Sequence, residues 1–259
     1  MKYPKQRYLP GAIFGCLLML LFASCSQKDK EMKDASPATD VETMTEYLVS
    51  QGFDGQQIVF EKDRVIIEED IIMTLPELEK RVADWQKEKA GDVQTEQRRH
   101  TYLISNAYNS NVRIYIDPGV PSSWRTAIQG AVNNWNAISG TRLGMSITSS
   151  QSNAHCVVFM GYQNANWVAR AYLPTSNGLP GVSVEINGYY NSLSASYKLF
   201  TITHELGHTI GFHHTNQTSG IHIPGTPTSD PNSVMNSFIL PWNGFTSGDI
   251  LATQIIYPQ

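Results

Sequence analysis

The sequence of 259 residues has few cysteines and only a small excess of negative charge. Cys16 and Cys25 lie in the first 25 residues, and Cys156 is the only cysteine in the rest of the chain, which argues against a structural disulfide there. Cys156 belongs to the apolar run HCVVFM, so we interpret it as a small buried hydrophobic residue. The formal net charge of -4 is small, so nothing in it indicates a nucleic-acid-binding surface or a polybasic membrane patch.

The sequence also has no apolar run that would span a bilayer comfortably. AIFGCLLMLLFA (12–23) is too short for that, but it follows three basic residues and ends in the small residues typical of a signal peptide. Its last part, LFASC, resembles a bacterial lipobox, in which Cys25 is lipidated and becomes the new N-terminus. Phe22 is bulkier than the usual residue at that position. An ordinary secretory signal with a chance cysteine is the alternative.

These features predict a lipoprotein signal peptide over residues 1–24 and a tether over 25–40, after lipidated Cys25. The charged stretch SQKDKEMKD (26–34) is similar to the signal that directs some Gram-negative lipoproteins to the outer face of the outer membrane. We therefore expect an exported outer-membrane lipoprotein exposed at the cell surface, with a periplasm-facing lipoprotein as the alternative.

A change in charge density divides the rest of the chain. Residues 26–100 contain 29 charged side chains, whereas residues 101–259 contain only 10. We expect residues 41–100 to be a charged N-terminal segment, similar to a pro-segment, with a linker at its end. Its patterns predict a helix over 41–51, a short hairpin over 57–71 and a second helix that begins at the capping residue Thr74.

Residues 101–259 alternate strand and helix patterns. The sequence predicts a strand at 112–117, a helix over 124–139 with a buried tryptophan face, and strands in 142–148, 155–162, 167–173 and 181–187. A second helix over 197–212, a coil rich in Gly, Pro, Ser and Asn, and a last helix capped by Thr246 follow. This order predicts a mixed sheet with helices packed on it.

The stretch TITHELGHTIGFHHT (201–215) contains four histidines. His204 and His208 are four residues apart, so on a helix they share one face and can bind the same metal ion. Glu205 lies about 100° around the helix from His204, beside the metal, where a carboxylate can accept a proton from a bound water molecule.

A catalytic zinc site needs a third protein ligand and one open position. Gly211 favours a sharp turn after the helix, which would bring His214 under the metal. His213 is the rival for that role, offset by one residue. Met235, in the turn-rich SDPNSVMNS, could form an apolar floor beneath the imidazoles.

HELGHTIGFHH matches HExxHxxGxxH, and with Met235 downstream the chain resembles the metzincin zinc metallopeptidases. HELGH and IPGTPTSDPNSVMN are similar to the bacterial dual-action HEIGH metallopeptidases, and TSGDILATQIIYP resembles the C-terminal helix of matrix metalloproteases. The resemblance covers residues 101–259. It implies an α+β, zincin-like catalytic domain with a twisted mixed sheet, an active-site helix and a C-terminal helix, preceded by a small α/β N-terminal segment.

The resemblance implies a zinc-dependent endopeptidase that hydrolyses peptide bonds with a metal-activated water molecule. One Zn²⁺ would be held by His204, His208 and His214, with Glu205 as the general base and Met235 as the structural Met-turn. Several metzincins carry a tyrosine two residues after that methionine, whereas this sequence has Ser237.

The resemblance also places the substrate antiparallel to an edge strand, here Ala169, Arg170, Ala171 and Tyr172. Glu69-Asp70-Ile resembles the motif by which some metzincin pro-segments block the metal through an aspartate, which makes Asp70 a candidate latency residue. An exposed acidic side chain in a hairpin is the alternative for Asp70.

We expect a monomer whose partners are a protein or peptide substrate and, through lipid on Cys25, the membrane, and we expect no nucleic acid. Two other functions fit the same residues. The protein could be a surface-binding lipoprotein that uses zinc only for structure, or a zinc hydrolase of non-peptide amides. Retention of Glu205 favours catalysis, because a structural site more often fills its fourth position with a protein ligand.

Overall fold

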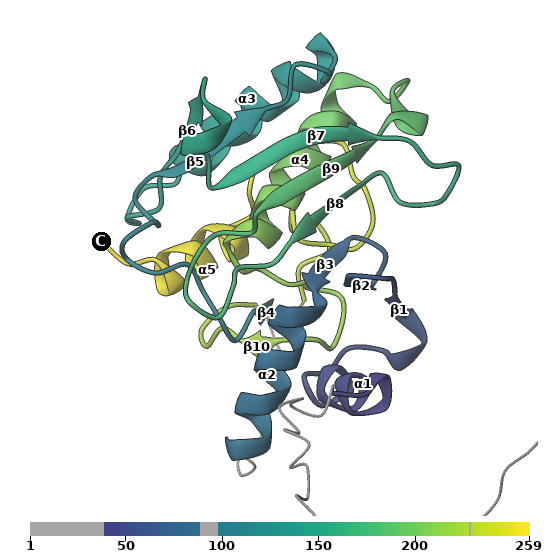
Figure 1. Ribbon diagram of the computed structural model, residues 1–259. Helices are drawn as coiled ribbons and strands as arrows, with labels where there is room; N and C mark the ends of the chain where they lie inside the picture. Colours follow the sequence, from purple (N-terminus) through teal and green to yellow (C-terminus); the bar gives the residue numbers. More distant parts are fainter. Residues whose placement is uncertain (1–38, 89–97, 228) are drawn as a thin grey trace, which may run out of the picture. The chain divides into compact units, whose positions relative to one another are not determined.

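The computed structural model describes residues 39–88 and 98–259 except residue 228 (Figure 1). The predicted signal peptide, Cys25 and most of the predicted tether lie outside the described residues. Among the helices that are described, none combines the length and the apolar character needed to cross a bilayer. The α-helices are α1 Val41–Ser50, α2 Leu75–Glu88, α3 Ser122–Asn136, α4 Ala195–Ile210 and α5 Ser247–Ile256. The strands are β1 Ile58–Phe60, β2 Arg64–Ile67, β3 Ile71–Thr74, β4 Arg98–Arg99, β5 Val112–Ile116, β6 Met145–Thr148, β7 Cys156–Gly161, β8 Ala169–Tyr172, β9 Ser183–Asn187 and β10 Ile221–His222.

The N-terminal segment contains two helices and three antiparallel strands. Asp40 caps α1 by accepting a hydrogen bond from the N–H of Thr43 (2.7 Å), and the Thr74 hydroxyl accepts from the N–H of Glu77 (3.3 Å) at the start of α2. The sequence predicted a hairpin between the helices, but RVIIEEDI turns back on itself at Glu68–Asp70. The segment therefore forms three strands, β1, β2 and β3.

The sheet is continuous from this segment into the rest of the chain. Its order is β1-β2-β3-β8-β9-β7-β5-β6, and β3 pairs in parallel with β8, with Ile71 opposite Ala171. Strand β8 runs antiparallel to β9, while β5, β6, β7 and β9 are parallel. The prediction that β8 is a sheet edge is therefore wrong for the full chain. β8 would be an edge only without β3, which the sequence analysis treated as part of a separate hairpin.

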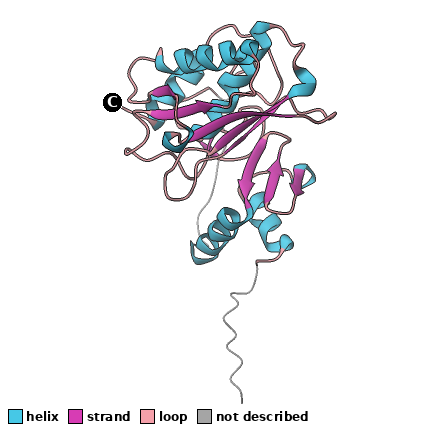
Figure 2. Ribbon diagram, turned by 45° about the horizontal axis from the view of Figure 1, so that its top comes forward, coloured by secondary structure: helices cyan, strands magenta, loops and turns pink. Residues whose placement is uncertain are grey.

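Helices α3 and α4 lie together on one face of the sheet (Figures 1 and 2). Trp124, Ile128 and Trp135 form the buried face of α3, as their spacing predicts, and pack in a large apolar core with α4 and the strands. A second apolar cluster lies between α1, α2 and the β1–β3 strands, and Leu173 joins it just after β8. The mixed α/β architecture predicted from the sequence is confirmed.

Gly207 in α4 marks a close contact between that helix and the segment around Met235. A Cβ atom at Gly207 would lie 2.4 Å from the Met235 sulfur and 3.3 Å from the Trp135 ring. Since Met235 is 1% exposed, its side chain has little room to move away.

Replacing Gly207 with alanine should lower the free energy of unfolding by about 1–3 kcal/mol, because the added methyl overpacks this contact. Gly130→Ala in α3 is the matched control. Its Cβ would meet the tip of the flexible Leu199 side chain at 2.7 Å, and alanine favours the helix. Chemical denaturation of both metal-free variants checks this, and equal effects would contradict it.

Candidate metal centre and active site

Helix α4 carries the histidine motif into the core. Every residue from Phe200 to Ile210 is buried, and the helix ends at Gly211, whose φ of +106° is left-handed. The N–H groups of Gly211 and Phe212 donate to the carbonyls of His208 and Gly207, each at 3.0 Å. The chain then turns sharply, as the glycine predicts, and brings His214 back towards α4.

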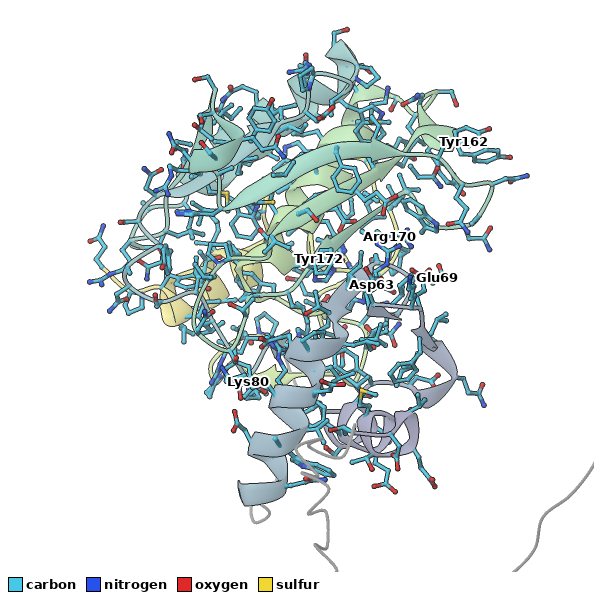
Figure 3. All side chains as sticks on the ribbon, viewed as in Figure 1. Asp63, Glu69, Lys80, Tyr162, Arg170 and Tyr172 are labelled. Carbon is cyan, nitrogen blue, oxygen red and sulfur yellow. The ribbon has the colours of Figure 1, made fainter. Side chains whose placement is uncertain are left out.

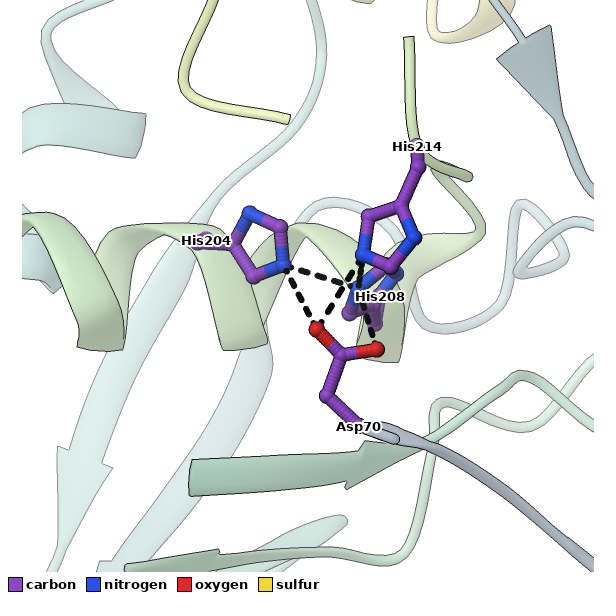
Figure 4. A group of neighbouring side chains, drawn as sticks. All are labelled: Asp70, His204, His208 and His214. Atoms are coloured by element: carbon purple, nitrogen blue, oxygen red, sulfur yellow. Dashed lines mark hydrogen bonds and ion pairs between the residues drawn. The ribbon is translucent and has the colours of Figure 1, made fainter. Parts of the chain in front are cut away.

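Three imidazoles converge on one point (Figure 4). Nε2 of His208 lies 3.0 Å from Nε2 of His204 and 3.2 Å from Nε2 of His214. Two nitrogens bound tetrahedrally to one zinc ion at about 2.0–2.1 Å lie about 3.3 Å apart. The spacing of the three nitrogens therefore fits a single ion of this size.

The other nitrogen of two of these rings, in His204 and His208, shows why positive charge is needed between the rings. Nδ1 of His204 lies 2.7 Å from the Val234 carbonyl oxygen, and Nδ1 of His208 lies 2.8 Å from that of Phe212. A carbonyl only accepts hydrogen bonds, so each Nδ1 carries a proton, and Nε2 is the nitrogen of each ring that is left to bind a metal ion. Lone pairs this close repel unless a cation lies between them, so the residues fit a metal ion.

Asp70 occupies the fourth side of this group. Its Oδ2 lies 3.1 Å from Nε2 of His214 and 3.4 Å from Nε2 of His204, and its Oδ1 lies 4.0 Å from Nε2 of His208 (Figure 4). One ligand atom from each of these four residues lies within 4.8 Å of the others. Asp70 thus lies at the histidine cluster, and not on an exposed hairpin.

The charges around His214 favour a cation. Burial would lower the pKa of His214, but the carboxylates of Asp70 and Glu68 outweigh it and raise that pKa to about 10. Burial alone would raise the pKa of Asp70, but the three imidazoles, His214 above all, hold it well below its usual range. The two carboxylates thus attract positive charge to this ring, as a proton or as a metal ion.

Glu205 lies beside the cluster and does not belong to it. The residue is 2% exposed, and its Oε2 has no hydrogen-bond partner among the described residues. Burial, and then the nearby charge of Asp70, raise the pKa of this carboxyl well above its usual range. A buried carboxylate with a free oxygen next to a metal centre is suited to accept and release a proton.

Met235 lies under α4, in a segment that also supports the cluster. The Ser233 hydroxyl and the Val234 N–H donate to the carboxylate of Asp249 in α5, at 2.6 Å and 3.1 Å. The carbonyl of the same Val234 accepts from His204. The C-terminal helix therefore fixes the segment that orients one ligand and places Met235 against Gly207.

The predicted substrate strand borders the site. Ala169 and Ala171 are buried. The Arg170 guanidinium lies 3.0 Å from the carboxylate of Glu185 in β9, and this ion pair explains why that strand contains a glutamate. Tyr172, at the end of β8, is partly exposed (Figure 3). The backbone edge of β8 is already paired, since the N–H of Ala171 donates to the Asp70 carbonyl (2.8 Å).

A cavity opens between these elements. Its walls are the turn 68–70, residues 166–169, the α4 side chains Phe200, Thr201, His204 and Glu205, and residues 236–239. Ser237 is in this wall, and no tyrosine is among the described residues that line the cavity. The tyrosine of several metzincins thus has no counterpart in this wall.

His213 points away from the metal centre. Its Nε2 lies 3.2 Å from Nδ1 of His100, the two rings stack, and Arg81 of α2 contacts Nε2 of His100. Burial, and then the neighbouring cations, lower the pKa of His213 to about 3 and also lower that of His100. This neutral pair therefore contacts α2 through Arg81 and helps to hold that helix in place. The sequence had predicted no role for His100.

The sequence analysis also missed Glu68. Its carboxylate lies 2.8 Å from Nδ1 of His214, and its side chain is 2% exposed. The only signal in the sequence is its position two residues before Asp70. The sequence gives no sign that the carbonyls of Val234 and Phe212 accept hydrogen bonds from the ligand histidines, because every residue has a main-chain carbonyl.

The sequence profile of the family described as dual-action HEIGH metallo-peptidase matches residues 65–220, more than half of the chain. Among curated protein sequences there is no match.

Several solved structures are similar to the chain. A crystal structure of myroilysin has a TM-score of 0.42 and 12% identity, with 65% of this chain and 100% of that one covered. High choriolytic enzyme 1, a hatching enzyme zinc-protease from Oryzias latipes (medaka fish), has a TM-score of 0.42 and 17% identity, with 60% of this chain and 94% of that one covered.

The family profile begins in β2 and ends beyond His214, so it includes Asp70, the three convergent histidines and Glu205. The chain belongs to the dual-action HEIGH metallopeptidase family.

Proposed function

We propose that this metallopeptidase is a zinc-dependent endopeptidase, held at the cell envelope by lipid and latent while its N-terminal segment is in place. One observation carries the catalytic part. Three imidazole nitrogens converge beside a buried carboxylate with a free oxygen, and His204 and that carboxylate, of Glu205, line a cavity next to β8. Three histidine nitrogens are a donor set typical of catalytic zinc.

Zinc held by His204, His208 and His214 supplies Lewis acidity, which activates water and polarises a carbonyl. The protein supplies the rest. Glu205 takes the proton from the attacking water molecule and later gives it to the leaving amine. Its raised pKa suits both transfers, because a strongly acidic carboxyl would accept the proton poorly.

Substrate recognition by β8 rests on main-chain hydrogen bonds. The strand presents its backbone towards the site once β3 is absent, and an extended peptide can pair with it whatever its side chains are. Phe200, Phe238 and Ile239 also line the cavity and offer apolar contacts to one substrate side chain. This arrangement supports cleavage within extended polypeptides.

Glu205→Gln should abolish proteolysis and leave metal binding intact. The amide keeps the size of the side chain but cannot accept the proton, and loss of a general base costs about 10²–10⁴-fold in rate. Casein hydrolysis and zinc content, measured on the same preparation after the N-terminal segment has been removed by limited proteolysis, check this. Full activity with bound zinc in the variant would contradict the role of Glu205.

Latency is supported by two contacts of the N-terminal segment. The Asp70 carboxylate lies against the three ligand nitrogens, where the fourth position of a zinc site would be. Strand β3 also pairs with β8, in parallel. A substrate that binds antiparallel to β8 needs the same backbone groups, so the segment blocks both the metal and the peptide-binding edge.

The same contacts favour the rival function of a structural zinc site. With Asp70 the metal would have four protein ligands, which is the closed set typical of structural zinc. The free oxygen of Glu205 and the family membership favour catalysis instead. The two functions differ in what loss of Asp70 should do.

Asp70→Ala in the full chain should raise the cleavage of a short peptide by about tenfold or more at saturating zinc. That increase corresponds to about 1.4 kcal/mol of blocking interaction removed. Cleavage of a protein substrate should rise less, because β3 still covers β8. Asp63→Ala, an exposed acid in the same segment, is the control and should change neither. If Asp70→Ala loses zinc and unfolds without any gain in cleavage, the site is structural.

The envelope anchor rests on the sequence around Cys25. The positive start, the apolar run 12–23 and the small residues before Cys25 support lipidation, and the charged stretch 26–34 supports exposure at the cell surface.

Cys25→Ser should move the protein from the detergent-rich phase to the aqueous phase in a phase-partition assay of cells, because its lipid is lost. Cys156→Ser, a substitution at the buried cysteine, is the control and should stay in the detergent-rich phase. Equal partition of the unsubstituted protein and Cys25→Ser would overturn the anchor without affecting the proposed chemistry.

A further inference from the structure

The three ligand imidazoles do not have equivalent supports. His204 and His208 each donate from Nδ1 to a main-chain carbonyl, of Val234 and Phe212. His214 instead has its Nδ1 2.8 Å from the Glu68 carboxylate, 146 residues away in the N-terminal segment. The support of this one ligand is therefore a side chain from the segment that also closes the site.

The turn that carries Glu68 is built for this contact. Ile67 and Ile71 pair across it, and Glu68 and Glu69 both have positive φ, 52° and 73°. Non-glycine residues seldom adopt this conformation, so other contacts must hold them. The Glu68 N–H donates to the Gln57 carbonyl (2.9 Å), and the Asp70 carbonyl accepts from Ala171 (2.8 Å).

This turn brackets a single imidazole. Glu68 Oε2 lies 2.8 Å from Nδ1 of His214, and Asp70 Oδ2 lies 3.1 Å from Nε2 of the same ring. Two residues of one turn therefore reach opposite sides of the ring, while Glu69 between them is exposed and lines the cavity.

We propose that Glu68 is a positioning residue for His214, so that the N-terminal segment strengthens metal binding at the same time as it blocks the site. A carboxylate on the outer nitrogen fixes the ring orientation and makes the inner nitrogen a stronger donor, and loss of such a partner typically costs about 10–100-fold in metal affinity. The inference rests on the proposed function only in that the site binds zinc.

This role of Glu68 implies that zinc binds before the N-terminal segment is removed. The intact chain acquires and retains its metal with both carboxylates of the turn in place. Removal of the segment opens the fourth position and, in the same step, leaves Nδ1 of His214 without its partner. The N-terminal segment therefore raises the zinc affinity of the site as well as blocking its fourth position. The activated form, which lacks the segment, binds zinc less tightly than the full chain.

The test is zinc affinity in the full chain, measured by competition with a chromophoric chelator and without substrate. Glu68→Ala should bind zinc about 10–100-fold more weakly. Glu68→Gln, whose amide oxygen still accepts from Nδ1, should lose only about three- to tenfold. Glu69→Ala, from the exposed side of the same turn, is the matched control and should equal the unsubstituted protein.

Two further measurements separate positioning from general damage. Near-ultraviolet circular dichroism in excess EDTA, at a temperature where both are folded, should be the same for Glu68→Gln and the unsubstituted protein. The visible spectrum of bound Co²⁺ should change in Glu68→Ala and be largely restored in Glu68→Gln. If Glu68→Ala folds poorly, Glu68→Gln carries the test. Its three- to tenfold loss supports the proposal, and an unchanged affinity overturns it.

Zinc affinity of a folded Glu68→Ala within threefold of the unsubstituted protein would overturn the proposal, as would an equal loss in Glu69→Ala. Neither result touches the role of Glu205, which is measured as cleavage. Conversely, a protein that binds zinc as described but cleaves nothing would refute the proposed peptidase and leave the role of Glu68 intact.

Discussion

Repulsion between three nitrogen lone pairs is the constraint on which the rest of the structure depends. His204, His208 and His214 turn Nε2 towards one point, and two of the rings are fixed that way by carbonyls that only accept. Such a group is stable only around positive charge. Much of the surrounding structure serves to keep these rings in place: the end of α4 at Gly211, the Val234 segment tied to Asp249, and the Glu68 turn.

The N-terminal segment is chemically part of this centre. Its strand β3 extends the main sheet, its Asp70 faces the ligand nitrogens, its Glu68 supports His214 and its Arg81 contacts the buried His100. A pro-like segment with a high charge density would be expected to lie on the surface. Here two of its carboxylates, those of Glu68 and Asp70, are instead directed at the histidine cluster.

The parts of the site that could be predicted are those encoded locally. The spacing of His204 and His208 on a helix and the turn at Gly211 follow from local geometry, and the match to HExxHxxGxxH favoured His214 over His213 as the third ligand. The pairing of β3 with β8 joins residues about 100 positions apart, and no periodicity in either strand specifies a partner. Glu68 was missed for the same reason, and Asp70 remained one of two alternatives. His100, ordinary in sequence, acquires its role only through burial against Arg81 and His213.

The most direct measurement of the central claim is X-ray absorption at the zinc edge of the purified full chain. The convergent imidazoles and Asp70 predict one zinc per chain, with three imidazole nitrogens and one oxygen at about 2.0–2.2 Å. In His208→Ala the three-imidazole signal should disappear. A six-oxygen shell, a sulfur ligand, or an unchanged spectrum in His208→Ala would contradict the account.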